Sequence, residues 1–348
     1  MKDTTLKKLR VKALERFREY EAIYVLINAM TVDIRKDFDR NKAGLENFNR
    51  NQLRSSIRRI EDEIKSLRDR YGITASNTTL EEILERIETF NDIVLIPKYE
   101  LKKYFKAYEN ALPTFLDLPE HTYIEIDNGF YRQEQGTIEV YLIETIIYED
   151  LCSLYNLASE INESIITNKK KNKEDMKKIS ALSRMIITTA LYFVEAYLNG
   201  IAFDYYMNNI ATLDIKTASL LLEYDLEKRK TKYLTLRDKA LKYPRIILGL
   251  DHSPLNEDNC PELAFIVNNA KDIRDAIVHA SPKPNMKTLV PEKEHILLNI
   301  KFKITERIVD NAISLVKKLE ESIFGHTKRL YWLYDRKPDG AFPEDVFK

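Results

Sequence analysis

At 348 residues the chain is long enough for two domains, each with a hydrophobic core of its own. It carries 55 basic and 55 acidic residues, so attraction to nucleic acid must come from a local patch rather than from net charge. Charged residues make up 32% and glycines number only 8, which favours helices over a turn-rich sandwich or a glycine-rich nucleotide-binding fold.

The N-terminal region is predicted to be a long antiparallel helical hairpin. Apolar residues recur three and four apart over 6–38 and again over 53–71, with a polar interruption at 41–44. This spacing describes two long amphipathic helices, and their short connection implies an antiparallel pair. A further helix is predicted over 77–91, where Asn77 supplies an N-cap.

The middle of the chain holds the one small β-hairpin that the sequence predicts. Residues 122–126 alternate between apolar and polar types and lead into Asp127-Asn128-Gly129, a typical hairpin turn, with 130–132 as the second strand. A helix is expected before it, over 97–110, and another after it, over 138–166.

A polar, basic run at 168–173 is predicted to be the domain boundary, because it has no face to bury. Residues 1–168 would then be an accessory domain that senses, regulates or oligomerises. Residues 173–326 would form a helical bundle, and 327–348 a terminal tail. The fold class expected is all-α with at most one small β-hairpin, and the bundle helices are predicted at 173–208, 212–244, 261–280 and 304–324.

The strongest local signal is Arg274-Asp275-x-x-x-His279, near the C-terminal end of a predicted helix. Asp275 and His279 are four apart, so the carboxylate can accept the imidazole Nδ1 proton and leave Nε2 free for proton transfer. Arg274 adds a planar cation suited to a phosphate. Arg274 and His279 are five positions apart, roughly 140° around the helix axis and about 7.5 Å along it, so one regular helix cannot close both side chains on a small group.

This motif, with Glu195 and Asn199 four apart in the central helix, resembles the HEPN (higher eukaryote and prokaryote nucleotide-binding) superfamily over roughly 179–324. The resemblance implies a four- or five-helix bundle that dimerises and brings two Arg-x4-His motifs to a two-fold cleft. It also implies a metal-independent ribonuclease that leaves cyclic phosphate ends and needs no cofactor. Arg274 would bind the scissile phosphate, His279 would act as acid or base, and Asp275 would orient the pair.

On the same resemblance, Glu195 and Asn199 would hold Arg274 or the motif helix in place; the alternative is a purely structural pair. Ser281 stands two residues after the histidine, where HEPN toxins paired with nucleotidyltransferase antitoxins have a tyrosine, which makes regulation by modification doubtful. For Arg274 and His279 the structural alternative is a helix-end arginine paired with an acidic neighbour.

A basic stretch adjoins the motif helix and is interpreted as an RNA contact, with a solvated face as the alternative. The 20 tyrosines mostly follow helical seams and are expected in the core and interfaces rather than in base stacking. The predicted RNA-binding residues are Lys228, Arg229, Lys230, Lys232 and Arg237.

The sequence thus predicts an RNA endonuclease effector, of the toxin or abortive-infection (antiviral) kind. Non-catalytic alternatives are a helical scaffold or sensor that keeps the fold for dimerisation, and nucleotide binding without hydrolysis. Expected partners are RNA, a second copy of the chain, and a regulatory or antitoxin protein. The two cysteines, Cys152 and Cys260, indicate neither a metal site nor a disulfide framework. Because the sequence shows no secretory signal and no apolar run of about eighteen residues, the protein is expected in the cytoplasm and not in a membrane.

Overall fold

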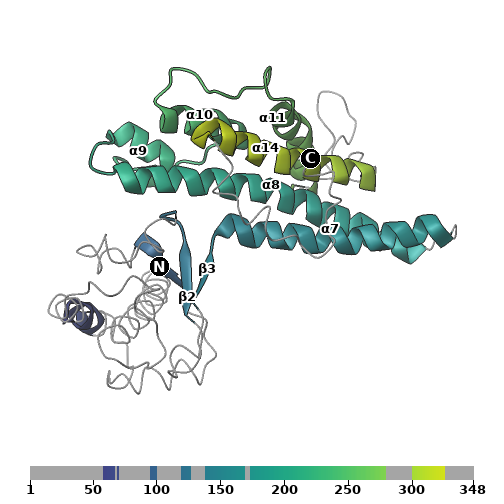
Figure 1. Ribbon diagram of the computed structural model, residues 1–348, viewed down its shortest axis with the longest axis horizontal. Helices are drawn as coiled ribbons and strands as arrows, with labels where there is room; N and C mark the ends of the chain where they lie inside the picture. Colours follow the sequence, from purple (N-terminus) through teal and green to yellow (C-terminus); the bar gives the residue numbers. More distant parts are fainter. Residues whose placement is uncertain are drawn as a thin grey trace. The chain divides into compact units, whose positions relative to one another are not determined.

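The computed structural model describes residues 58–66, 69, 95–99, 119–126, 138–168, 173–279 and 300–325. Most of these residues are helical, which confirms the predicted all-α fold class (Figure 1). The chain divides into two compact units, residues 1–142 and 143–348.

In the first unit the structure describes a helical segment at 58–66 and a three-stranded antiparallel sheet. Ile60 and Ile64 are buried, four residues apart, as the predicted apolar seam requires. The strands are β1 (Leu95–Pro97), β2 (Tyr123–Ile126) and β3 (Ile138–Tyr141), in the order β1-β2-β3. The helices predicted at 6–38 and 77–91, most of the one at 97–110 and nearly half of the one at 53–71 lie outside the described residues.

The strand predicted at 122–126 is confirmed as β2, while the predicted turn at 127–129 and second strand at 130–132 lie outside the described residues. β2 pairs with β3, Ile124 lying opposite Val140, and with β1 on its other edge. Residues 138–141 were expected to begin a helix. Their Ile-Glu-Val-Tyr alternation fits a strand, and four residues are too few for helical and strand periodicity to be told apart without knowing the pairing partner.

The second unit is a bundle built around one long helix, α8 (Lys173–Asn209). Helices α7, α10, α12 and α14 all pack against α8. α7 runs antiparallel to α8 along part of its length (Figure 1). Inside the bundle the hydroxyl of Tyr197 on α8 donates to the buried carboxylate of Glu320 on α14. The remaining elements are α7 (Ile143–Asn168), α9 (Ile215–Leu221), β4 (Tyr224–Asp225), β5 (Lys230–Thr231), α10 (Leu236–Leu248), α11 (Pro261–Phe265), the π-helical η2 (Ile266–Ala270), α12 (Lys271–Val278) and α14 (Phe302–Phe324).

The division between the units falls at 142/143, whereas the sequence prediction set it at 168–173. α7 therefore belongs to the C-terminal bundle, where it packs along α8. A polar run that cannot bury a face suits the connection between two antiparallel helices as well as it suits a linker between domains. The pattern alone does not distinguish the two.

The single helix predicted over 212–244 is broken in the structure. α9 ends at Leu221, a β4–β5 hairpin follows, and α10 begins at Leu236. Glu223 and Arg229 adopt positive φ angles, 48° and 51°, which no helix accommodates. Thr235 then starts α10 as its N-cap, accepting the Asp238 N–H at 3.1 Å, and Pro244 lies inside that helix rather than at its end.

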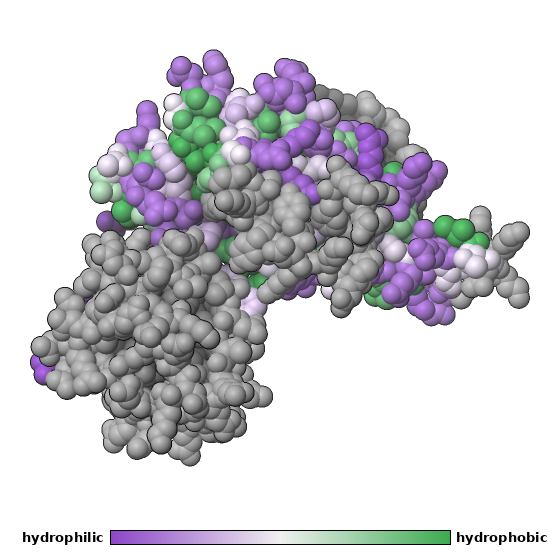
Figure 2. All heavy atoms as spheres, viewed as in Figure 1, coloured by the Kyte–Doolittle hydropathy of each residue, from purple (hydrophilic) through white to green (hydrophobic). Residues whose placement is uncertain are grey.

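Within the described residues, α8 is the one helix long and apolar enough to cross a membrane, and 61% of that apolar stretch is buried inside the protein. Such burial is typical of the core helix of a bundle. The face of the second unit seen in Figure 2 mixes polar and apolar residues, with an apolar area over α10.

Candidate functional site

The Arg-x4-His motif lies at the end of a helical run whose middle is π-helical. The run begins with Pro261 at its first position and passes from α11 through η2 into α12, so the predicted helix 261–280 is confirmed up to Val278. The wider π turn leaves Asn268 and Asn269 both exposed. π turns inside helices occur frequently at functional sites.

On α12, Asp275 is the centre of a small ion cluster. Its Oδ2 accepts a hydrogen bond from Lys271 Nζ at 2.7 Å, and its Oδ1 lies 3.0 Å from Arg274 Nε. The second contact is an ion pair without hydrogen-bonding geometry, because Arg274 Nε is buried and has no hydrogen-bond partner among the described residues. The side chains of Arg274 and Asp275 are 23% and 25% exposed, so a ligand can still approach the pair.

The pKa of Asp275 reflects this surrounding charge. Partial burial acts to raise it, but the hydrogen bond from Lys271 and the charges of Arg274, Lys271 and His279 outweigh burial, so the pKa lies below its ordinary value. Asp275 is therefore a carboxylate at neutral pH.

His279 ends α12 as its C-cap. Its N–H donates to the Asp275 carbonyl at 2.9 Å, while its own φ and ψ, −114° and 39°, turn the chain out of the helix. The side chain is exposed.

The predicted pairing of Asp275 with the His279 ring is not what the structure shows. Among the described residues no hydrogen bond joins the two side chains, and Lys271 takes the carboxylate instead. The competing lysine was missed by the sequence reasoning, although its spacing, four residues before Asp275, is the ordinary ion-pair spacing of a helix. His279 acts on Asp275 through charge alone.

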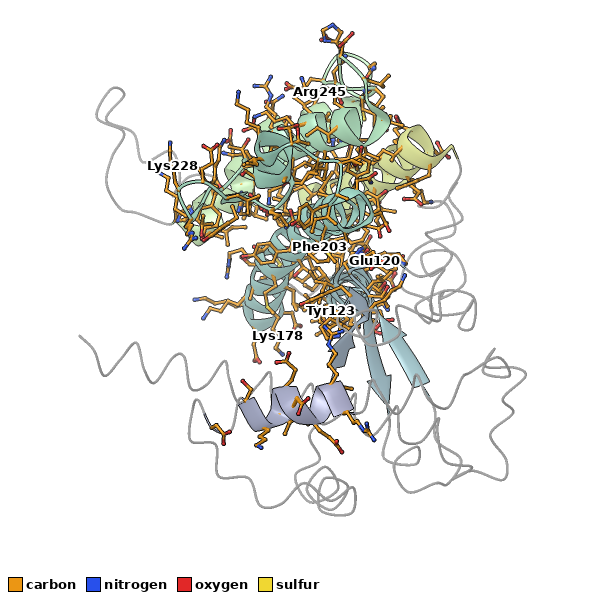
Figure 3. The ribbon with its side chains drawn as sticks, turned by 90° about the vertical axis from the view of Figure 1, so that its left-hand side faces the viewer. Glu120, Tyr123, Lys178, Phe203, Lys228 and Arg245 are labelled. Atoms are coloured by element: carbon orange, nitrogen blue, oxygen red, sulfur yellow. The ribbon has the colours of Figure 1, made fainter. Side chains whose placement is uncertain are left out.

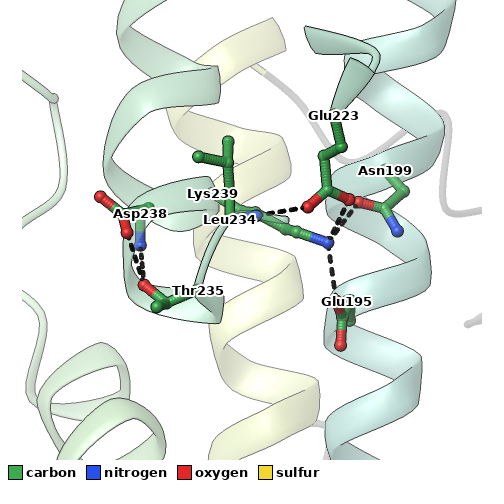
Figure 4. A network of polar contacts seen from close by, with 7 residues as sticks. All are labelled: Glu195, Asn199, Glu223, Leu234, Thr235, Asp238 and Lys239. Atoms are coloured by element: carbon green, nitrogen blue, oxygen red, sulfur yellow. Dashed lines mark hydrogen bonds and ion pairs between the residues drawn. The ribbon is translucent and has the colours of Figure 1, made fainter. Parts of the chain in front are cut away.

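Glu195 and Asn199 do lie together on α8, yet they hold Lys239 rather than Arg274 (Figure 4). Lys239 Nζ donates to Glu195 Oε1 at 2.6 Å and to Asn199 Oδ1 at 3.0 Å, and lies 2.7 Å from Glu223 Oε2. The Lys239 side chain is only 2% exposed. The family-based role of Glu195 and Asn199 is thus corrected: they anchor α10 and the base of the hairpin to the central helix.

Lys239 and Glu223 were also missed by the sequence reasoning. A signal was present: Leu236, Ala240 and Tyr243 mark the buried face of α10, and Lys239 shares it. A lysine on an apolar face needs a carboxylate partner. Nothing in the sequence named Glu223 as that partner, because the hairpin that brings it there was not predicted.

The predicted RNA-binding residues are divided between two settings. Lys228, Arg229, Lys230 and Lys232 are exposed on and beside the β4–β5 hairpin rather than along a helix. Arg237, at the start of α10, forms an ion pair with Glu257. The same Glu257 also accepts a hydrogen bond from Asn268 at 2.9 Å, which ties the loop before α11 to the π turn.

Among the residues that the structure describes, no group of three His, Cys, Asp or Glu side chains lies close enough together to hold a metal ion. Cys152 and Cys260 are free thiols in the interior, where burial raises the pKa of each. A comparison with protein-family models, with curated proteins and with solved structures found no match to this chain.

Proposed function

We propose that the C-terminal bundle is a metal-independent RNA endonuclease in which Arg274 and His279 carry the reaction. The observation that carries the proposal is the end of α12, where an accessible guanidinium beside Asp275 and an exposed imidazole lie within five residues of each other. The resemblance of this motif to HEPN ribonucleases supports the same activity.

The reaction is transesterification by RNA's own 2′-hydroxyl. The hydroxyl oxygen attacks the adjacent phosphorus as an imidazole removes its proton, and the bond from phosphorus to the 5′-oxygen breaks as that oxygen takes up a proton. The products are a 2′,3′-cyclic phosphate and a 5′-hydroxyl. The Arg274 guanidinium offsets the negative charge that builds on the phosphoryl oxygens.

Two copies of the chain supply the complete site in this proposal. Arg274 lies inside α12, whereas His279 caps its end with non-helical backbone angles, and residues five positions apart on a helix lie roughly 140° apart around its axis. Val278, beside the histidine, is 47% exposed, an apolar side chain of the kind that a second copy would cover. One imidazole then acts as the base and the other as the acid.

The experiment is RNA cleavage by the full-length protein in EDTA, with His279→Ala and Arg274→Ala as test variants. His252→Ala is the matched control, because His252 is exposed in the loop after α10. We expect His279→Ala to lower the rate by at least about 100-fold, the range for loss of a general acid or base, and the control to cleave normally. Full cleavage by both test variants would refute the proposal.

Mixing the two inactive variants tests the composite site. A heterodimer of His279→Ala with Arg274→Ala holds one arginine and one histidine on opposite chains, so activity returns in part if the site is shared. No recovery, with exchange of subunits demonstrated, would confine the site to one chain.

A non-catalytic scaffold is the competing function, and the Lys271–Asp275–Arg274 cluster would serve it by fixing the surface of α12. As a toxin-like effector the wild-type chain is expected to arrest growth on expression, and both substitutions to relieve the arrest. A growth effect that survives both substitutions would favour the scaffold.

A further inference from the structure

The β4–β5 hairpin projects a small surface that combines aromatic and basic side chains. Tyr224 lies opposite Thr231, and Asp225 opposite Lys230. The Lys232 N–H donates to the Glu223 carbonyl at 2.8 Å, so the ladder continues by one more pair towards the bundle. Strand alternation then places Tyr224, Thr231 and Tyr233 on one face.

Tyr233 is the most exposed of the large apolar and aromatic side chains in the described residues, at 86%. Tyr224 and Leu226 are 37% and 38% exposed. The tyrosines were expected in the core and in interfaces. Tyr224 and Tyr233 depart from that expectation because they lie in the hairpin and not on the buried face of a helix. A tyrosine ring held in water has a flat face open to a planar ligand.

Four exposed cations, Lys228, Arg229, Lys230 and Lys232, lie in the same hairpin, and strand alternation places Lys230 and Lys232 on the face opposite the two rings. Among the described residues, no carboxylate lies within ion-pair distance of any of them. Asp225 Oδ1 accepts the Lys228 N–H at 2.8 Å, and that hydrogen bond, with the charges of Lys228 and Lys230, lowers the pKa of Asp225. Figure 3 shows Lys228 at the end of the hairpin, away from the helices.

The base of this hairpin is fixed to the bundle. Glu223 accepts the Leu234 N–H through Oε1 at 2.7 Å and pairs with Lys239 through Oε2, so one carboxylate joins both ends of the hairpin to the buried lysine (Figure 4). Two-residue strands are marginal on their own. The Lys239 cluster therefore gives the hairpin a rigid support that its own ladder does not provide.

We propose that the hairpin 223–233 binds single-stranded RNA, with Tyr233 and Tyr224 stacking on bases and the four cations contacting phosphates. The inference rests on the proposed ribonuclease function, for which the hairpin would hold the substrate strand. Aromatic side chains that alternate with cations are the usual means of binding single strands without reading sequence. A membrane surface fits less well, because one leucine and two tyrosines offer little apolar area to insert into lipid.

The test measures binding separately from cleavage, by fluorescence anisotropy of a labelled single-stranded RNA of about ten nucleotides, a length within the usual site size for such surfaces. Every protein carries His279→Ala in the full chain so that the RNA stays intact. Tyr233→Ala is expected to weaken binding about tenfold, within the range for removal of one base stack, and Tyr233→Phe to bind like its parent. Tyr192→Ala is the matched control, since Tyr192 on α8 is 47% exposed and distant in sequence from the hairpin.

The cations are tested by salt dependence. Lys230→Ala with Lys232→Ala is expected to make the slope of log Kd against log salt shallower by about 1.4, or about 0.7 for each phosphate that is no longer neutralised. Equal binding by Tyr233→Ala and its parent, an equal loss for Tyr233→Phe, or stronger binding to anionic lipid vesicles than to RNA would each overturn the inference.

These outcomes are separable from failure of the proposed function. RNA that binds through Tyr233 but is not cut by the wild-type chain removes the nuclease and leaves the binding surface. RNA that is cut normally while Tyr233→Ala binds like its parent removes the binding surface and leaves the nuclease.

Discussion

Replacing Lys239 with methionine tests the buried cluster that supports both α10 and the hairpin. Methionine has a similar length and fills the same space, but it removes the charge that Glu195 and Glu223 share. Asn199 loses a hydrogen bond as well. Two carboxylates then lie close together without a cation.

Breaking a buried ion pair from one side costs about 3–5 kcal/mol. Glu195 is 34% exposed and water can solvate it in part, so the lower end, about 3 kcal/mol, is the value expected here. For a unit the size of 143–348 this corresponds to a fall in melting temperature of about 6–12 °C. Lys242→Met is the matched control on the same helix, since Lys242 and its partner Asp238 are both 39% exposed and such a pair contributes at most about 1 kcal/mol.

Thermal denaturation followed by circular dichroism at 222 nm measures both variants. A rescue variant adds Glu195→Gln and Glu223→Gln to Lys239→Met, and it is expected to recover most of the stability because no uncompensated charge remains. Lys239→Met melting within about 2 °C of the wild type, less than 1 kcal/mol for a domain of this size, would refute the role assigned to the cluster.

Further predictions concern the motif and the hairpin. Asp275→Asn should lower the stability of the protein at neutral pH. Because the pKa of Asp275 is depressed in the folded state, the wild type is more stable than the variant above the ordinary aspartate pKa of about 3.9, and it loses this advantage as pH falls through the folded pKa. The difference in melting temperature between the two proteins should therefore be smaller at pH 3 than at pH 7. A gap of constant size would contradict this. Arg229→Gly should stabilise the bundle by about 1 kcal/mol in denaturation, because glycine adopts the φ of 51° at this position without strain. The same substitution should weaken RNA binding measured by anisotropy. A gain in stability together with a loss of binding would indicate that the arginine is kept for binding.

Sequence periodicity predicted the long bundle helices well. α8 and α14 were expected at 173–208 and 304–324, and they lie at Lys173–Asn209 and Phe302–Phe324. Long helices with one buried stripe carry many repeats of the same spacing, so the pattern outweighs any local exception. The motif helix was found for the same reason, although nothing in its sequence indicated the π turn at 266–270.

Short elements and side-chain partners were harder to predict. The hairpin between α9 and α10 depends on positive φ angles at Glu223 and Arg229, which are residue types that seldom adopt them. Glu195 and Asn199 were found as a pair but were assigned the wrong partner. The partner, Lys239, is 40 residues further along the chain, and only the packing of α10 on α8 brings it there.

The proposed nuclease uses the exposed imidazole of His279 and the guanidinium of Arg274 to cut RNA through its own 2′-hydroxyl. The most direct measurement is the chemistry of the new 3′ ends after digestion in EDTA, read by mass spectrometry of a defined oligonucleotide. The wild-type chain is expected to give 2′,3′-cyclic phosphates, and His279→Ala is expected to leave the RNA intact. Products that end in a 3′-hydroxyl, or cyclic ends formed equally well by His279→Ala, would contradict it.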